Sequence, residues 1–197
     1  MQHASTCHIR AMRRADLDAV LRVQAACYPP SMQEAAPVLL ARLEAASGTC
    51  VVAQDDQGVC GYLFAYPGRA GAVTPLGEEF SVAPGADLLY LHDLAVAPRA
   101  HGRGVARRLA AHLLAQARDG GFRSSALVSV QDTARFWAGL GFRATAPGCP
   151  AARAALATYP GVAQYMTRPL TGPGAPWPNC SCLPASGTGC RTCCVRS

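Results

Sequence analysis

Residues 91–106, Leu-His-Asp-Leu-Ala-Val-Ala-Pro-Arg-Ala-His-Gly-Arg-Gly-Val-Ala, decide the fold and point to a binding site. The apolar run before Pro98 predicts a strand, Gly102 and Gly104 predict a tight turn, and the pattern that follows predicts a helix. The first N–H groups of a helix have no partner within it, and the aligned peptide dipoles add about half a positive charge there. Glycines let the main chain approach a ligand closely, because no Cβ intervenes. The stretch therefore predicts a site for a phosphate or pyrophosphate.

Two other phosphate-binding loops do not fit the sequence. A Walker loop needs the lysine of Gly-x-x-x-x-Gly-Lys-Ser/Thr, and the chain contains no lysine. A dinucleotide-binding turn reads Gly-x-Gly-x-x-Gly and opens a βαβ unit near the start of a domain. The order Leu-Ala-Val-x-Pro followed by Arg-x-x-Gly-x-Gly instead resembles the GNAT family of N-acetyltransferases, whose loop holds the pyrophosphate of acetyl-coenzyme A (acetyl-CoA). The alternative is a surface turn that only joins a strand to a helix.

The resemblance implies a fold of the α/β (α+β) class: a mixed central β-sheet flanked by helices, with a splayed strand pair that holds acyl-CoA. It also implies acetyl-CoA as co-substrate. In the family the pantetheine arm of the cofactor pairs with a strand, here with the backbone of Leu94, Ala95 and Val96. The loop and helix start that would hold the diphosphate comprise Arg99, Ala100, His101, Gly102, Arg103, Gly104, Val105 and Ala106.

The sequence after the glycine turn carries the same resemblance. Apolar residues at three- and four-residue steps over 105–117 predict an amphipathic helix, and Gly120-Gly121 predicts its end. A short buried strand is predicted at 126–130. The residues that follow resemble the family's Asn-x-x-Ala-x-x-Phe/Leu-Tyr-x-x-x-Gly-Phe segment, which lies beside the pantetheine arm and the thiol. This adds Gln131, Phe136 and Trp137 to the expected cofactor site.

Two residues of this segment depart from the family pattern. Gln131 matches the family's asparagine only loosely. Trp137 stands where the family often has a tyrosine that protonates the leaving thiolate, and an indole N–H is a donor that cannot act as an acid near neutral pH. We therefore assign the thiol's proton donor to Tyr165, near the last predicted strand, with Tyr159 as the alternative.

The segment Tyr90-Leu-His-Asp93 is similar to the Tyr-Leu-Glu-Asp of the family's diamine acetyltransferase branch. His92 stands at the glutamate position, and an imidazole with a reference pKa of ~6.5 suits a base that works near neutrality. Asp93 is expected to orient His92 or to bind the acceptor's cation. Strand alternation places the two side chains on opposite faces unless a bulge intervenes. The alternative for His92 is a hydrogen-bonded core histidine.

Composition sets the class of protein. Half of the 197 residues are apolar and 15% are charged, which is typical of a single folded domain. The net charge is +6, but no basic tract is interleaved with aromatic residues, so we expect no nucleic-acid partner. The sequence shows no signal peptide and no apolar run of the ~18–20 residues that span a bilayer. We therefore expect a cytoplasmic protein without membrane association; homodimer formation stays open.

The chain divides at Leu170. We expect a GNAT domain over 1–170, with helices and a hairpin before the phosphate loop and a long Gly/Pro-rich connection over 67–87 that covers the acceptor pocket. Residues 171–197 form a Gly/Pro/Cys-rich tail that we expect to be disordered. Its cysteines do not have a standard zinc spacing and no histidine accompanies them, so we expect no metal, with a zinc-binding interaction module as the alternative.

Together these features predict an acetyl-CoA-dependent N-acetyltransferase that moves an acetyl group directly to a primary amine of a small molecule or peptide. Its catalytic residues would be His92, Asp93 and Tyr165. The alternative is a non-catalytic domain that binds or senses acyl-CoA, which the tryptophan at position 137 and the histidine at position 92 favour.

Overall fold

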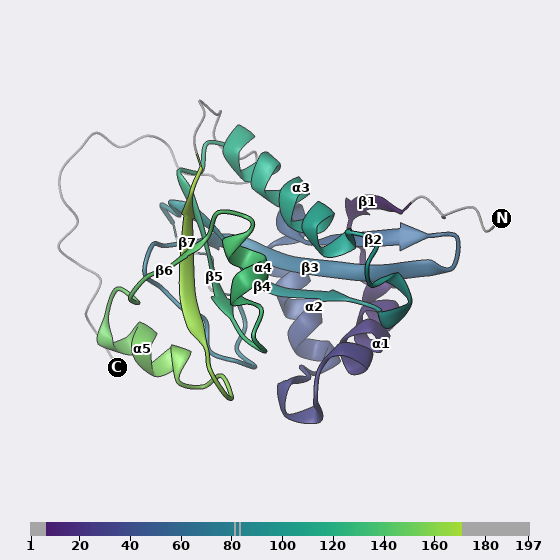
Figure 1. Ribbon diagram of the computed structural model, residues 1–197, viewed down its shortest axis with the longest axis horizontal. Coiled ribbons are helices and arrows are strands. Elements are labelled where there is room, and N and C mark those ends of the chain that lie inside the picture. Colours follow the sequence, from purple (N-terminus) through teal and green to yellow (C-terminus); the bar gives the residue numbers. More distant parts are fainter. Residues whose placement is uncertain (1–6, 81, 83, 171–197) are drawn as a thin grey trace.

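A computed structural model describes residues 7–80, 82 and 84–170. The expected disordered tail, with its alternative zinc site, lies outside these residues. One seven-stranded sheet runs through the described chain in the order β1-β2-β3-β4-β5-β7-β6 (Figure 1). The strands are β1 (His8–Ala11), β2 (Val51–Asp55), β3 (Gly58–Gly68), β4 (Leu88–Val96), β5 (Ser124–Ser129), β6 (Arg143–Ala144) and β7 (Gln164–Pro169). The helices are α1 (Leu17–Cys27), α2 (Ala36–Ala45), α3 (Val105–Asp119), α4 (Ala134–Ala138) and α5 (Pro150–Leu156).

The sheet is mixed, as the sequence predicts. β4 and β5 are parallel and are connected through α3, whereas the other neighbouring strands are antiparallel. The β4–β5 pairing begins at Leu88↔Ser124 and ends at Leu91↔Leu127, although β4 continues to Val96. The second half of β4 therefore has a partner on the β3 side and none in β5. This half carries the residues that the sequence assigns to the cofactor.

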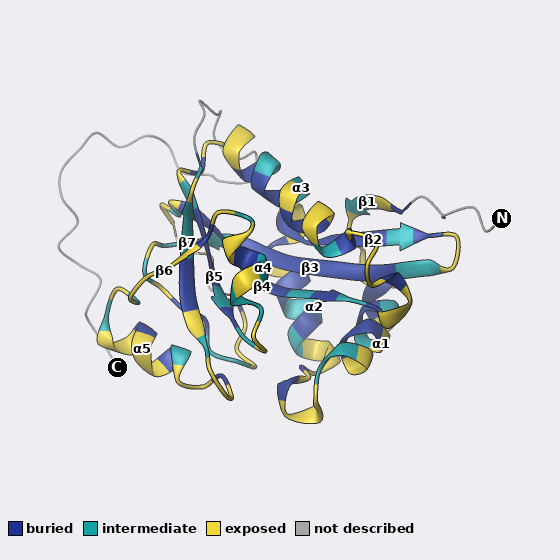
Figure 2. Ribbon diagram, in the orientation of Figure 1, coloured by how far each residue is buried: buried dark blue, intermediate teal, exposed yellow. Residues whose placement is uncertain are grey.

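Helices cover both faces of the sheet. Alternate residues of β3 point to opposite faces: Tyr62 and Phe64 pack with α1 and α2, and Leu63 and Ala65 pack with α3. Figure 1 shows α1 and α2 on one side of β3 and β4, and α3 on the other. In Figure 2 the central strands and the inward stripes of the helices are buried, while the outward stripes are exposed. The sheet therefore separates two apolar cores, and the end of β4 lies between them.

The predicted helix after the glycine turn is confirmed as α3. Its buried residues recur at three- and four-residue steps and face the sheet: Val105, Leu109, Ala110, Leu113, Leu114 and Ala117. The helix ends at Asp119, and Gly121 takes the left-handed conformation that the glycine pair predicts (φ 88°). Among the described helices, none combines the length and the hydrophobicity that a membrane crossing needs.

Helix α5 and strand β6 were not predicted. Pro150 occupies the first turn of α5, where the missing N–H of proline costs nothing, and the Cys149 side chain accepts a hydrogen bond from the Ala152 N–H. The N–H of Gly148, just before α5, donates to the carbonyl of Gly71 over 2.9 Å. The long connection after β3 is therefore joined to the α5 region.

We predict that Gly71→Ala destabilises the protein more than Gly77→Ala. Both glycines have positive φ (78° and 83°), so each alanine carries a similar backbone penalty of about 1–2 kcal/mol. A Cβ at position 71 would also lie 2.7 Å from the Gly148 Cα, whereas a Cβ at position 77 meets nothing within 4 Å. Urea unfolding measures the difference, and equal free energies of unfolding for the two variants would contradict the close Gly71–Gly148 approach.

Candidate active site

The glycine turn forms an open anion site at the start of α3. A short 3-10 turn (Pro98–Ala100) follows β4, and Gly102 and Gly104 then adopt left-handed φ values of 74° and 71°. A Cβ on either glycine would meet nothing within 4 Å, so the main chain here borders open space. The first helical bond joins the Arg108 N–H to the Gly104 carbonyl, so the N–H groups in the first turn of α3 have no partner within the helix.

A cavity of 660 Å³ lies in front of this turn. It extends from the start of α3 along the second half of β4 to the turn after β5. The predicted cofactor residues among its lining are Leu94, Ala95, Val96, Ala100, His101, Gly102, Gly104, Val105, Ala106, Gln131 and Phe136. The structure therefore brings most of the predicted cofactor site together around one cavity.

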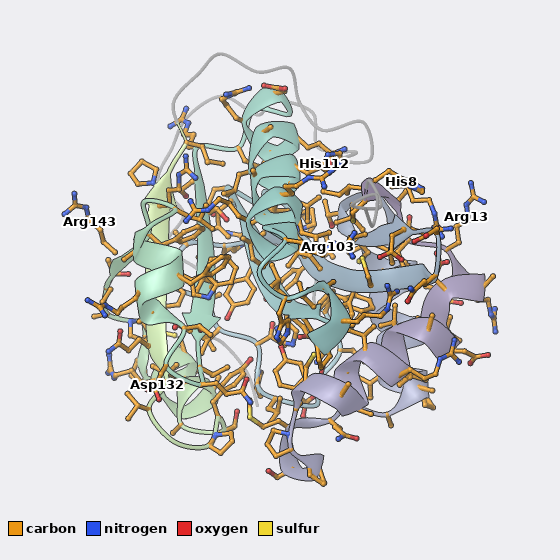
Figure 3. The ribbon with its side chains drawn as sticks, turned by 45° about the vertical axis from the view of Figure 1, so that its right-hand side comes forward. His8, Arg13, Arg103, His112, Asp132 and Arg143 are labelled. Carbon is orange, nitrogen blue, oxygen red and sulfur yellow. The ribbon has the colours of Figure 1, made fainter. Side chains whose placement is uncertain are left out.

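Arg99 and Arg103 were expected to meet phosphates, but both side chains pair with Asp55. Arg99 Nη1 donates to both carboxylate oxygens of Asp55 (2.9 and 2.8 Å), and Arg103 Nη1 lies 3.0 Å from Asp55 Oδ2. Hydrogen bonding from Arg99 lowers the pKa of Asp55. Neither arginine is among the residues that line the cavity, and Figure 3 labels Arg103 near the start of α3. These side chains attach the glycine turn to the β2–β3 hairpin.

A second cavity of 190 Å³ continues the first one between β4 and β5. The two cavities share Leu94, Gln131 and Phe136 in their walls. The second cavity starts where β4–β5 pairing has ended, and apolar side chains from both cores line it, Trp137 among them. Trp137 is buried and makes edge contacts with the rings of Phe136 and Phe142. Trp137, which stands where the family often has an acidic tyrosine, is thus part of an apolar cavity wall.

A β-bulge in β4 brings His92 and Asp93 to the same face. On β3, Phe64 is opposite Asp93 and Ala65 is opposite Leu91, so His92 is the extra residue. Both side chains line the 190 Å³ cavity. The sequence allowed this arrangement only if a bulge intervened, and the structure has that bulge.

Asp93 is held between two tyrosines. The hydroxyl of Tyr28 donates to Asp93 Oδ1 over 2.7 Å, and the hydroxyl of Tyr62 donates to Oδ2 over 2.8 Å. Burial raises the pKa of Asp93 to about 6, although both hydrogen bonds favour the ionised form. Near pH 7.5 the carboxylate is therefore mostly ionised and can attract a cation within a low-dielectric cavity.

His92 is a neutral, buried imidazole. Its side chain is 2% exposed, and burial lowers its pKa. Its Nε2 lies 3.9 Å from Glu34 Oε1, and its Nδ1 is buried with no hydrogen-bond partner among the residues that the structure describes. The arrangement is not that of a hydrogen-bonded core histidine, because one ring nitrogen remains unsatisfied in a cavity wall.

Glu34, which sequence reasoning missed, lines a third cavity, of 30 Å³, together with His92 and Asp93. Leu76, from the long connection after β3, lines the same cavity, so this connection contributes to the wall at the expected acceptor side. Glu34 lies outside the regular helices, and its partner Arg42 lies on α2, so no spacing in the sequence links either residue to His92.

Tyr165 lies away from these cavities. It is buried in β7, its hydroxyl accepts a hydrogen bond from the Gly71 N–H over 3.0 Å, and it lines none of the three cavities. Tyr159 lines the 30 Å³ cavity, and its hydroxyl donates to the Thr74 carbonyl. The position of Tyr165 does not support the role of thiol acid.

The turn after β5 is strained beside the cavities. Gln131 and Asp132 have φ values of 52° and 58°, a conformation uncommon outside glycine. Gln131 lines both larger cavities. Within the described ranges, no group of three or more histidine, cysteine, aspartate or glutamate side chains is placed to hold a metal ion.

The comparisons with known proteins agree with this geometry. The profile of the Acetyltransferase (GNAT) family matches residues 17–142. The chain therefore belongs to the GNAT acetyltransferase family. No curated protein matches the sequence significantly.

Several solved structures share the fold. The GphF GNAT-like decarboxylase in complex with isobutyryl-CoA is 22% identical, with a TM-score of 0.69 over 83% of this chain and 100% of that one. A phosphinothricin acetyltransferase from Sinorhizobium meliloti in complex with AcCoA is 19% identical, with a TM-score of 0.62 over 90% and 98%. The ribosomal-protein-S18-alanine N-acetyltransferase from Escherichia coli is 15% identical, with a TM-score of 0.62 over 86% and 97%. At these identities the matches establish the fold alone.

We predict that Asp93→Asn changes the pH dependence of stability. The pKa of Asp93 is about 6 in the folded chain and near ~3.9 unfolded, so the folded state binds more protons between these values and stability falls as pH rises from about 4 to about 6. Asparagine removes this loss. The free energy of unfolding of the variant minus that of the native protein should therefore be larger at pH 7.5 than at pH 4, by up to about 3 kcal/mol.

Urea unfolding at the two pH values tests this prediction. The lost hydrogen-bonding capacity of the variant affects both measurements, so only the difference between them reports the titration. A difference near zero would show that Asp93 keeps an ordinary pKa in the folded protein.

Proposed function

We propose that the protein is an acetyl-CoA-dependent N-acetyltransferase that moves the acetyl group directly to a primary amine of a small molecule or peptide. The observation that carries the proposal is the continuity of the cavities. The open space at the start of α3 leads along the edge of β4 that has no partner in β5 to His92 and Asp93. This is the arrangement that a long thioester cofactor and a reacting group at its end require.

The cofactor's diphosphate would bind the main-chain N–H groups at the start of α3. The pantetheine arm would pair with the half of β4 that has no partner in β5. Carbonyl groups along this edge already have side-chain neighbours: Cys27 Sγ donates to the Val96 carbonyl over 3.2 Å, and the Tyr28 hydroxyl, whose single proton goes to Asp93, lies 3.0 Å from the Leu94 carbonyl oxygen. The Leu94 carbonyl keeps a second lone pair for an amide of the cofactor, whereas His101 Nε2 also lies 2.8 Å from the Val96 carbonyl oxygen.

Acetyl transfer needs a neutral amine, and an alkylamine with a pKa near ~10.4 is mostly protonated at neutral pH. The Asp93 carboxylate would attract the ammonium, and His92 Nδ1 would take its proton directly or through water. The amine nitrogen then attacks the thioester carbon, and a main-chain N–H of β4 stabilises the oxyanion. The C–S bond breaks, and the nitrogen loses its second proton to water, which leaves a neutral amide. The thiolate leaves without help from Trp137, because a thiolate is less basic than the attacking amine.

Free thiol provides the test of this reaction. Acetyl-CoA and a panel of primary amines and peptides should give amine-dependent release of CoA thiol and products heavier by one acetyl group. Tight binding of acetyl-CoA without thiol release for any acceptor would favour the non-catalytic acyl-CoA-binding domain.

A second candidate reaction is decarboxylation of a malonyl-type thioester. Trp137 is compatible with it, because loss of carbon dioxide leaves the C–S bond intact and involves no leaving thiolate. In this step the bond to the carboxylate carbon breaks, its electron pair forms the thioester enolate, and the enolate carbon takes a proton. Malonyl-CoA would then give acetyl-CoA with no free thiol, an outcome distinct from acetyl transfer. The GphF protein, whose fold this chain shares, is described as a GNAT-like decarboxylase.

We predict that Gly104→Ala weakens CoA binding at least tenfold, whereas Gly161→Ala leaves it unchanged. The two glycines have φ values of 71° and 73°, and a Cβ on either one meets nothing within 4 Å, so the backbone penalty is matched. Only the Gly104 Cβ would occupy the space in front of α3. Isothermal titration calorimetry with CoA measures both, and equal affinities would place the diphosphate elsewhere.

We predict that His92→Ala lowers kcat for acetyl transfer by about a hundredfold or more, the usual contribution of a general base, with little change in CoA affinity. His112→Ala is the control, because His112 lies on α3 and lines none of the three cavities. Steady-state kinetics and calorimetry test the pair. An unchanged kcat for His92→Ala would remove His92 from the proton transfer.

A further inference from the structure

We propose that Glu34, held by Arg42, is a positioning residue that keeps the proton of His92 on Nε2 and leaves Nδ1 as the basic atom. The inference about the tautomer rests on the geometry alone, and its catalytic consequence rests on the proposed acetyl transfer.

Arg42 fixes the Glu34 carboxylate. Its side chain is fully buried and donates to both carboxylate oxygens: Nη2 to Oε1 over 2.6 Å, and Nη1 to Oε2. The Gly77 N–H also donates to Oε1, over 2.9 Å. Burial opposes ionisation, yet the neighbouring His92 and Arg42 lower the pKa of Glu34 to about 2. The carboxylate is therefore ionised and has little freedom to rotate.

The backbone of Glu34 is fixed as well. Gln24, a buried residue of α1, donates through Nε2 to the Glu34 carbonyl over 2.9 Å and accepts from the Glu34 N–H over 3.1 Å. Arg42 also binds the Glu78 carbonyl through Nε and Nη2 (3.0 and 2.6 Å). Glu34 is thus attached to α1, α2 and the long connection after β3, independently of His92.

Phe80 and Glu34 flank the His92 ring. Phe80 contacts it edge-on, with ring centroids 5.2 Å apart, and the Arg42 guanidinium lies 5.0 Å from the Phe80 centroid. Nε2 faces Glu34 Oε1 at 3.9 Å, which is longer than a hydrogen bond, so the interaction acts through charge. An N–H on Nε2 presents its positive end to the carboxylate, whereas a lone pair there would be repelled. The charge therefore selects the tautomer with Nδ1 unprotonated.

Arg42 explains why His92 remains a base rather than a permanent cation. The groups that face or adjoin the ring are Glu34, Arg42, Asp93, Tyr28, Tyr90 and Tyr159. A lone buried carboxylate would stabilise a protonated imidazole, which has no lone pair to accept a proton. Because Arg42 balances the Glu34 charge, burial dominates and lowers the pKa of His92. Nδ1 therefore stays unprotonated, and the His92 side chain that carries it lines the same cavity as Asp93.

Histidine ¹⁵N NMR of the intact protein at pH 7.5 tests the tautomer without substrate. The His92 signals, identified by their loss in His92→Gln, should show a protonated Nε2 and an unprotonated Nδ1. A protonated Nδ1 would overturn the inference, whether or not the protein transfers acetyl groups. This measurement needs no Glu34 variant and stands even if such a variant fails to fold.

Glu34→Gln tests the catalytic consequence, with Glu78→Gln as the control because Glu78 reaches Arg42 only through its backbone carbonyl. Glu34→Gln should lower kcat about tenfold, leave the KM for the amine nearly unchanged, and move the acid limb of the kcat profile to lower pH, because Glu34 raises the pKa of His92. Glu78→Gln should match the native protein in all three. A raised KM with unchanged kcat would instead make Glu34 a direct contact of the amine and overturn the positioning role.

Absence of acetyl transfer in the native protein would contradict the proposed function but not the tautomer, which the NMR measurement decides separately. If transfer occurs and Glu34→Gln keeps the native acid limb and kcat, the positioning role is wrong while the proposed function stands.

Discussion

The site depends on one irregularity in hydrogen bonding, the bulge at His92. In a regular strand, consecutive side chains point to opposite faces, and His92 or Asp93 would then lie in the core beneath α3. The extra residue turns both toward α1 and α2, where Tyr28, Tyr62 and Glu34 meet them. Two titratable groups thereby share a cavity that neither alternation nor helix packing alone would assemble.

The two ends of the site depend on different kinds of interaction. At the start of α3, main-chain groups border open space, and the glycines matter for their conformation rather than for side-chain chemistry. At the bulge, buried side chains matter through their protonation, because burial raises the pKa of Asp93 and lowers that of His92. The half of β4 that has no partner in β5 runs from the bulge toward the start of α3; β3 holds it on one side, and its other side is an edge between the two ends.

Much of the fold was readable from local signals. The strand, glycine turn and helix over 91–119 follow from periodicity and φ preference, and the mixed sheet follows from the family resemblance. The Glu34–Arg42 pair could not be predicted from the sequence. The two residues lie 58 and 50 positions before His92 in the chain and come close to it only through tertiary packing. Tyr165 was assigned from its place in the chain, but its hydroxyl faces Gly71. Asp55 was missed for the same reason: its arginine partners lie 44 and 48 positions away.

The Asp55 pairing has a consequence for how the cavity depends on the surrounding electrolyte. With Arg99 and Arg103 engaged by a carboxylate, Arg107 is the charged side chain among the described residues that line the 660 Å³ cavity. Mobile ions weaken attraction between exposed charges much more than directional bonds from peptide groups. A nucleotide bound here would therefore depend less on ionic strength than one held by the Arg99 and Arg103 side chains.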